Sequence, residues 1–111
     1  MKAIDIYCQG QILCGNNANE EYLLKETGID KVFFVNRALS DLKRDIIPNI
    51  NCEISADTKT LDALICGVAY YLALKYNSNE KSAFLSDMYN SKRAIALSKI
   101  SNIKCSRVFK Q

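Results

Sequence analysis

The amino-acid sequence predicts a mainly α-helical fold, a small bundle of three to four helices that includes one long antiparallel helical pair. Three observations lead to this prediction. The 111 residues include one proline and four glycines, too few turn-forming residues for an all-β chain of this length. Apolar side chains recur at helical spacing in three long stretches, residues 30–46, 58–76 and 80–100. The length and the balance of 49% apolar and 24% charged residues fit a single domain over residues 1–111.

The N-terminal quarter begins with a predicted helix over residues 2–14, in which Gly10 weakens an otherwise helical spacing of apolar side chains. The run GNNAN at residues 15–19 ends that helix. Residues 19–26 are then expected to form a short helical turn, because an asparagine can cap it and two glutamates lie at its positive end.

Residues 30–46 predict the next helix. Asp30 is a favourable N-cap, and Pro48 ends the helix because the residue before a proline avoids the helical conformation. One apolar stripe runs along this helix, and it consists of Val32, Val35, Leu39, Leu42 and Ile46.

Residues 49–55 alternate between apolar and polar side chains, which is the period of a short strand. A strand needs a partner, and residues 103–109 are the one candidate for a short β pairing. The other interpretation is an extended connector that packs on the helices. The last residues, about 100–111, are expected to form an extended C-terminal arm.

The most apolar part of the chain runs from Ala63 to Leu74 without a charged or strongly polar side chain. It belongs to the helix predicted over residues 58–76. A membrane-spanning helix needs about 20 apolar residues, so this run is too short and we expect no membrane segment. A helix that is apolar on every side should be buried on every side, either by its own domain or by a neighbouring subunit. In a chain this small, one core rarely covers a helix completely, so burial by a neighbouring subunit is a serious alternative.

Gly67 lies in the middle of this helix, where a glycine costs about 1 kcal/mol relative to alanine. A close approach of a neighbouring helix explains it. Residues 77–80 break the helix, and another helix follows over residues 80–100. So short a break predicts that the two long helices form an antiparallel pair.

The sequence contains no recognisable catalytic, metal or cofactor motif. It has no histidine, and its five cysteines are an odd number without CxxC spacing. Cys66 has only apolar neighbours, so we interpret it as a buried packing residue and not as a reactive thiol. Asp41 and Asp45 are interleaved with basic residues, an arrangement typical of a solvated outer face. We therefore predict that the chain is not an enzyme and uses no cofactor.

Charge is distributed unevenly along the chain. Up to Asp87 there are nine basic and twelve acidic residues, whereas the residues after it include six basic ones and no acid. Such a basic end suits contact with nucleic acid or with an acidic partner surface, and it is equally typical of a solvated helix face with a loose tail. One function open to the chain is therefore that of a small helical nucleic-acid-binding or regulatory protein.

Two motifs and the order of the elements carry a family resemblance. VNRALSDLKRDI lies in one predicted helix, and LDALICGVAYYLALKYNSNEKSAFLSDMYNSKRA covers the helical pair. Together they resemble the small head–tail connector proteins of tailed bacteriophages, also called adaptor or head completion proteins, over residues 30–99. The resembling positions are Asn36, Arg37, Ala38, Leu39, Leu64, Gly67, Ala69, Leu72, Ala73, Ala83, Phe84, Tyr89, Lys92 and Arg93.

The resemblance implies a structural virion protein without catalysis or cofactor. Such a protein forms a homo-oligomeric ring of about twelve subunits on the portal vertex. Its partners are the portal protein and a tail or stopper protein, and DNA passes through the ring without sequence-specific contacts. Its location is the head–tail junction of the virion, and the host cytoplasm during assembly. The residues predicted to contact neighbouring subunits or partners are Tyr70, Tyr71, Tyr89, Lys92, Arg93, Lys99, Arg107 and Lys110.

Overall fold

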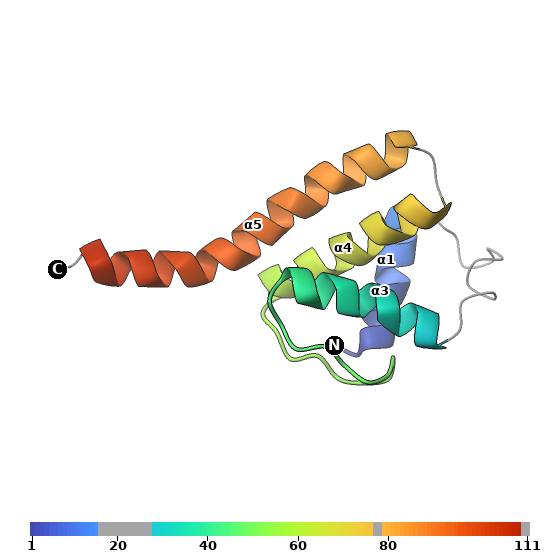
Figure 1. Ribbon diagram of the computed structural model, residues 1–111, viewed down its shortest axis with the longest axis horizontal. Helices are drawn as coiled ribbons and strands as arrows, with labels where there is room; N and C mark the ends of the chain where they lie inside the picture. Colours follow the sequence, from blue (N-terminus) through green and yellow to red (C-terminus); the bar gives the residue numbers. More distant parts are fainter. Residues whose placement is uncertain (16–27, 77–78, 110–111) are drawn as a thin grey trace.

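The computed structural model describes residues 1–15, 28–76 and 79–109, and its account of side chains leaves out residues 28–29, 76, 79–81 and 99–109. This part of the chain contains four helices: α1 spans Ala3–Cys14, α3 spans Gly28–Asp41, α4 spans Thr58–Tyr76 and α5 spans Asn79–Phe109. The predicted mainly α-helical bundle is therefore confirmed (Figure 1). The helical turn predicted at residues 19–26 lies outside the described residues.

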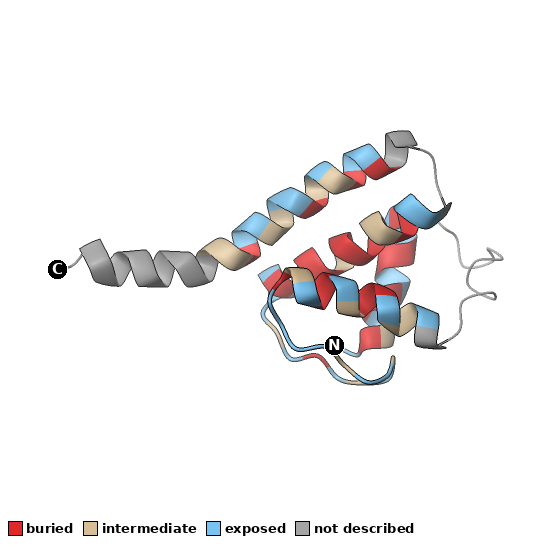
Figure 2. Cartoon of the chain, in the orientation of Figure 1, coloured by how far each residue is buried: buried red, intermediate tan, exposed pale blue. Residues whose placement is uncertain are grey.

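Helix α4 is the centre of the bundle, because α1, α3 and α5 all pack against it (Figure 1). Its bounds match the helix predicted over residues 58–76. Between Ala63 and Leu74, every side chain except Leu74 is buried or half-buried (Figure 2). The chain's own helices thus cover α4, and no neighbouring subunit is needed to bury it. None of the helices in the described residues is both long and apolar enough to cross a membrane.

Helices α4 and α5 form the predicted antiparallel pair (Figure 1). The charge of Lys92 in α5 acts on Cys66 in α4, so these two residues lie close together. Further along α4, the Tyr70 ring lies against Tyr89, with ring centroids 6.0 Å apart. Residue numbers therefore rise along α4 as they fall along α5. Helix α5 is longer than predicted and continues to Phe109. No glycine or proline follows its first residue, so the sequence offers no strong helix breaker before that point.

The possible β pairing of residues 49–55 with residues 103–109 does not form. Residues 103–109 belong to α5, and the backbone as far as Phe109 is helical where an extended arm over residues 100–111 was expected. Residues 49–52 form a turn, in which the Cys52 amide donates to the Asn49 carbonyl at 3.3 Å, and residues 52–55 follow the other interpretation, an extended connector packed on the helices.

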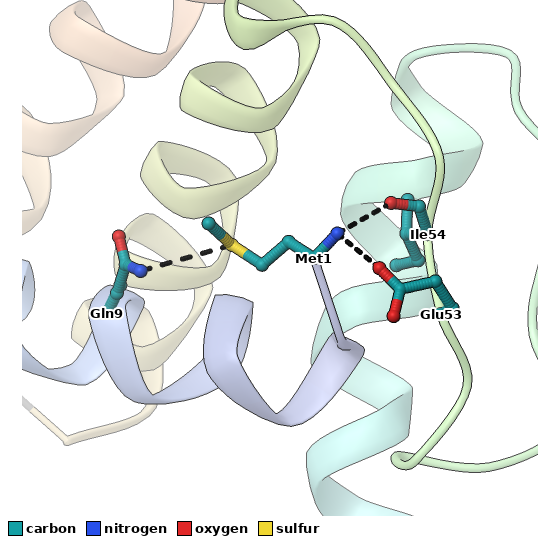
Figure 3. Close-up of polar contacts among 4 residues, drawn as sticks. All are labelled: Met1, Gln9, Glu53 and Ile54. Carbon is teal, nitrogen blue, oxygen red and sulfur yellow. Dashed lines mark hydrogen bonds and ion pairs between the residues drawn. The ribbon is translucent and has the colours of Figure 1, made fainter.

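The N-terminal residues, and not residues 103–109, pair with that connector through backbone hydrogen bonds. The Ala3 amide donates to the Cys52 carbonyl and the Ile54 amide donates to the Met1 carbonyl, both at 2.9 Å. The Met1 ammonium group pairs with Glu53 at 2.5 Å and donates to the Ile54 carbonyl at 3.1 Å (Figure 3). Because Glu53 is well exposed, the ion pair adds little to the stability of this arrangement.

Helix α3 ends at Asp41, earlier than the predicted end at residue 46. Lys43 adopts the left-handed conformation with φ 59°. The Lys43 amide donates to the Ser40 carbonyl at 3.0 Å, and the Arg44 amide donates to the Leu39 carbonyl at 2.9 Å. These are the two hydrogen bonds of a Schellman motif, which usually places glycine at the left-handed position. A lysine in that position gives no sequence signal for the end of the helix.

Local contacts fix the end of α1 and the start of α4. Gly15 ends α1 in the left-handed conformation with φ 93°, as its place in the GNNAN run predicts. Asp57 caps α4, because its Oδ1 accepts a hydrogen bond from the Thr60 amide at 2.9 Å. The Asn36 side chain donates to the Ile47 carbonyl at 3.0 Å and accepts from the Ile47 amide at 2.9 Å, which holds the chain after α3 against that helix.

Candidate functional site

Asp41 connects three helices through hydrogen bonds to two tyrosines. Its Oδ2 accepts hydrogen bonds from the Tyr71 hydroxyl of α4 and from the Tyr89 hydroxyl of α5, the latter at 2.7 Å. Asp41 is the last residue of α3, so one carboxylate oxygen joins α3, α4 and α5. Its side chain is half-buried, which corrects the prediction of a solvated outer face, whereas Asp45 is exposed. We call Asp41, Tyr71 and Tyr89 the Asp41 cluster.

Two arginines lie over the tyrosine rings of this cluster. The guanidinium carbon of Arg37 is 4.5 Å from the centroid of the Tyr71 ring, and that of Arg93 is 5.6 Å from the Tyr89 ring. Both distances are within the range of cation–π attraction. The Tyr70 ring lies 5.2 Å from Tyr71 and 6.0 Å from Tyr89, between centroids. Aromatic and cationic groups therefore surround the shared carboxylate.

Gly67 has no side chain, and this lets the Tyr89 ring of α5 and Ala38 of α3 approach α4 closely. A Cβ atom on Gly67 would lie 2.8 Å from Cε1 of Tyr89 and 3.0 Å from Cβ of Ala38. Both distances are shorter than the 3.5 Å or so at which carbon atoms pack without repulsion. The sequence-based explanation of this glycine, a close approach of neighbouring helices, is therefore confirmed.

The environment raises the pKa of both tyrosines of the cluster. For Tyr89 burial is the largest cause, followed by the hydrogen bond to Asp41 and by the charge of that carboxylate. The same causes in the same order raise the pKa of Tyr71, and Arg37 acts in the opposite direction. Both hydroxyls therefore remain protonated at neutral pH and act as hydrogen-bond donors, so the cluster stabilises the helix junction.

The raised pKa of Tyr89 predicts a loss of stability in alkaline solution. A tyrosine of the unfolded chain ionises near pH 10, whereas the folded chain holds the Tyr89 proton to higher pH. Above pH 10 the unfolded state thus binds fewer protons, and the free energy of unfolding falls as the pH rises. The contribution is fully present below pH 10 and is expected to fall by at most about 1.4 kcal/mol per pH unit above it.

Urea denaturation of the wild-type chain and of Tyr89→Phe measures this effect. The variant is expected to be less stable by a constant amount below pH 10, because it lacks the hydrogen bond to Asp41. Above pH 10 the difference between the two proteins should shrink, since phenylalanine does not ionise. A difference that stays constant into strongly alkaline solution would contradict the raised pKa of Tyr89.

The three tyrosines predicted as interface residues differ in their exposure. Tyr70 and Tyr71 are half-buried on α4. Tyr89 is only 2% exposed. Its side chain packs inside the bundle and offers no surface to a partner, which corrects that prediction.

The basic residues predicted as interface residues lie in or beyond α5. Lys92 and Arg93 are half-buried, and Nη2 of Arg93 donates to Oδ1 of Asn90 at 3.4 Å. The structure therefore brings Arg93 to the Asp41 cluster, over the Tyr89 ring. The side chains of Lys99 and Arg107 lie outside the described residues, as does Lys110.

Cys66 is buried, as the sequence predicts. Burial raises the pKa of its thiol, although the charge of Lys92 acts in the opposite direction. A thiol with a raised pKa stays protonated and is a poor nucleophile at neutral pH. In the part of the chain that the structure describes, no group of three or more cysteine, aspartate or glutamate side chains is placed to hold a metal ion.

A surface groove lies between α3 and α4 and has no counterpart in the sequence-based predictions. Its larger part, about 490 Å³ in volume, is lined by Asp30, Phe33, Phe34, Arg37, Tyr71, Leu74 and Lys75. Its smaller part, about 270 Å³, lies along α3 and is lined by Phe33, Asn36, Arg37, Ser40 and Asp41. The two parts share Phe33 and Arg37, and we call them together the α3–α4 groove. Asp41 and Tyr71 of the Asp41 cluster line the groove, and Arg37 lies over the Tyr71 ring, so groove and cluster adjoin.

The fold and these features define a small all-α bundle with a polar junction of three helices and an aromatic, arginine-bearing groove beside it. Comparisons with protein families, with curated proteins and with solved structures found no match to this chain. The likeness to the connector family therefore rests on the resembling residues themselves.

Proposed function

We propose that this chain is a subunit of the head–tail connector of a tailed bacteriophage, a structural virion protein. In this role it forms a ring on the portal vertex and joins the capsid to the tail, and the DNA passes through the ring. The portal protein and a tail or stopper protein are its partners.

The observation that best supports this proposal is that the resembling segments meet at one point. Ala38 lies in the first resembling motif, and Gly67 and Tyr89 lie in the second; the three residues approach one another where α3, α4 and α5 pack together. Residues in such close packing constrain one another's size, so these positions form one structural unit. Other resembling apolar positions are buried in the same bundle, namely Leu39, Leu64, Ala69, Leu72 and Ala73.

Helix α5 carries the surface that best suits contact between ring subunits. Phe84 and Ile95 are 63% and 44% exposed. They are eleven residues apart, about three turns at 3.6 residues per turn, so they lie on one face of the helix. A neighbouring subunit on this face would remove two large apolar side chains from water. Because the bundle itself covers α4, we assign the ring contact to α5.

The test mixes the purified chain with a portal protein encoded beside it in the same genome, and examines the mixture by negative-stain electron microscopy and sedimentation. We expect rings bound to the portal. Phe84→Asp is expected to abolish the rings while circular dichroism shows unchanged helix content, because the charge falls in the apolar contact. Asn90→Asp is the matched control: it adds the same charge at an exposed site on another face of α5 and should leave the rings intact.

Nucleic-acid binding by the basic end of the chain is the competing function. It predicts a monomer whose affinity for DNA falls steeply with salt and weakens when Lys92 and Arg93 are replaced by glutamine. A chain that behaves in this way and does not bind the portal would overturn the connector proposal.

A further inference from the structure

The α3–α4 groove is a surface apart from the α5 face assigned to ring contacts. Phe33 and Leu74 line its larger part and are 57% and 55% exposed, large fractions for side chains of this kind. The Phe33 and Phe34 rings pack edge to face with centroids 6.1 Å apart, so the α3 side of the groove is an aromatic wall. A large apolar side chain entering between Phe33 and Leu74 would cover apolar surface on both helices.

Arg37 is the charged group best placed to orient such a ligand. It is exposed and lines both parts of the groove. Its guanidinium group lies over the Tyr71 ring, 4.5 Å from the centroid, and among the described residues no carboxylate forms an ion pair with it. Arg37 also interacts with the Tyr71 hydroxyl through a side-chain hydrogen bond, and the other donors of the planar guanidinium group are available for a carboxylate.

The charges of the groove favour a peptide over a nucleic acid. Asp30 and Lys75 line the larger part and Asp41 the smaller part, with Arg37 common to both. The two cations are thus balanced by two carboxylates, which the closely spaced phosphates of a nucleic-acid strand would also meet. A single carboxylate next to an apolar group meets Arg37 and leaves the rest of its contacts to aromatic and aliphatic side chains.

We propose that the α3–α4 groove binds a segment of a partner protein in which an aspartate or glutamate neighbours a large apolar side chain. The carboxylate pairs with Arg37, and the apolar side chain lies between Phe33 and Leu74. Arginine and aromatic residues commonly dominate the binding energy of such contacts, so a short segment suffices for recognition. This interaction does not depend on the connector role.

Selection of short random peptides on the immobilised full-length chain tests the proposal. The enriched peptides are expected to combine an acidic residue with a neighbouring phenylalanine, tryptophan or leucine. One of them is then synthesised with a fluorescent label, and its Kd is measured by anisotropy. Arg37→Gln and Leu74→Ser are each expected to weaken binding about 10-fold or more. Arg93→Gln is the matched control, since Arg93 also lies over a tyrosine but does not line the groove.

A cycle of paired changes locates the carboxylate. Replacing the acidic residue of the peptide by its amide should weaken binding to the wild-type chain, and it should have little further effect on binding to Arg37→Gln. Arg37→Lys keeps the charge but lacks the planar donors, so its Kd should lie between those of the wild type and of Arg37→Gln. Arg37 and Leu74 are exposed and Arg93 is half-buried, and circular dichroism checks that all the variants remain folded.

Several results would overturn this proposal. They are the absence of enriched peptides, enrichment of basic peptides, and equal Kd values for the wild type and Arg37→Gln. DNA binding that is lost in Arg37→Gln would assign the groove to nucleic acid, and self-association that is lost in Leu74→Ser would assign it to a second copy of the chain. The results with peptides do not bear on ring formation, which is tested at Phe84, so the two proposals fail or stand separately.

Discussion

Replacement of Gly10 by alanine is expected to lower the free energy of unfolding by about 1–3 kcal/mol, the usual cost of forcing an extra methyl group into a packed core. A Cβ atom on Gly10 would lie 2.6 Å from Cγ1 and 2.8 Å from Cβ of Val68, and 3.3 Å from the Ala69 backbone nitrogen. Val68 cannot turn away easily, because a β-branched side chain in a helix has one strongly preferred rotamer. Helices α1 and α4 must therefore move apart. Urea denaturation measures the change.

The neighbouring exposed position gives the control for this prediction. Gln9→Ala adds no atoms to the core and is expected to change the free energy of unfolding by about 0.5 kcal/mol or less. Val68→Ala should partly offset the cost of Gly10→Ala, because it removes the Cγ1 atom 2.6 Å from the new methyl group, although the Cβ atom at 2.8 Å stays. If Gly10→Ala instead stabilises the chain by about the 1 kcal/mol that helix propensity provides, α1 and α4 do not approach as closely as described.

Local signals were sufficient to predict the helices whose ends carry a conventional residue. Helix α1 ends at a glycine, and α4 begins after a capping aspartate and has the predicted bounds. The end of α3 escaped prediction because Lys43 takes the left-handed position that glycine usually occupies. Pro48 was therefore taken as the stop, although the helix had already ended.

Contacts between distant residues were predicted less well. Gly10 looked like a weakness of its helix, because only the folded structure reveals that Val68 lies against it. The role of Gly67 was easier to predict, since a glycine in the middle of a long apolar helix directly suggests close packing. The strand-like alternation at residues 49–55 was real, but its partner is the N-terminal segment, and nothing in either sequence specifies that choice.

The polar site was largely hidden from sequence reasoning. Asp41 looked like a surface residue because its neighbours along the chain are charged, but its partners Tyr71 and Tyr89 are 30 and 48 residues away. The groove left one local signal: Phe33 falls beside the apolar stripe of its helix, so an aromatic side chain on an outer face was foreseeable. The opposing wall on α4 was not foreseeable, because it depends on how two helices pack together.

Replacement of Asp41 by alanine is expected to lower the free energy of unfolding by about 3 kcal/mol, because it removes two hydrogen bonds to a charged acceptor. The Tyr89 hydroxyl is then left in the core without its acceptor. The loss also removes the polar link of α3 to both α4 and α5, since the carboxylate is the shared partner of their tyrosines. Asp45→Ala is the matched control: it removes the same charge from an exposed site nearby and should have little effect.

Single and double variants distinguish the shared carboxylate from two independent contacts. Tyr89→Phe is expected to cost more than Tyr71→Phe, because Tyr89 is buried whereas Tyr71 is half-exposed. In the background of Asp41→Ala, Tyr89→Phe should cost less than in the wild type by about 1 kcal/mol or more, since the hydroxyl no longer has an acceptor to lose. Strictly additive effects in urea denaturation would show that Asp41 does not hold α5 through Tyr89. The contact of α5 with α4 would then depend on side-chain packing, such as that at Gly67 and between the Tyr70 and Tyr89 rings.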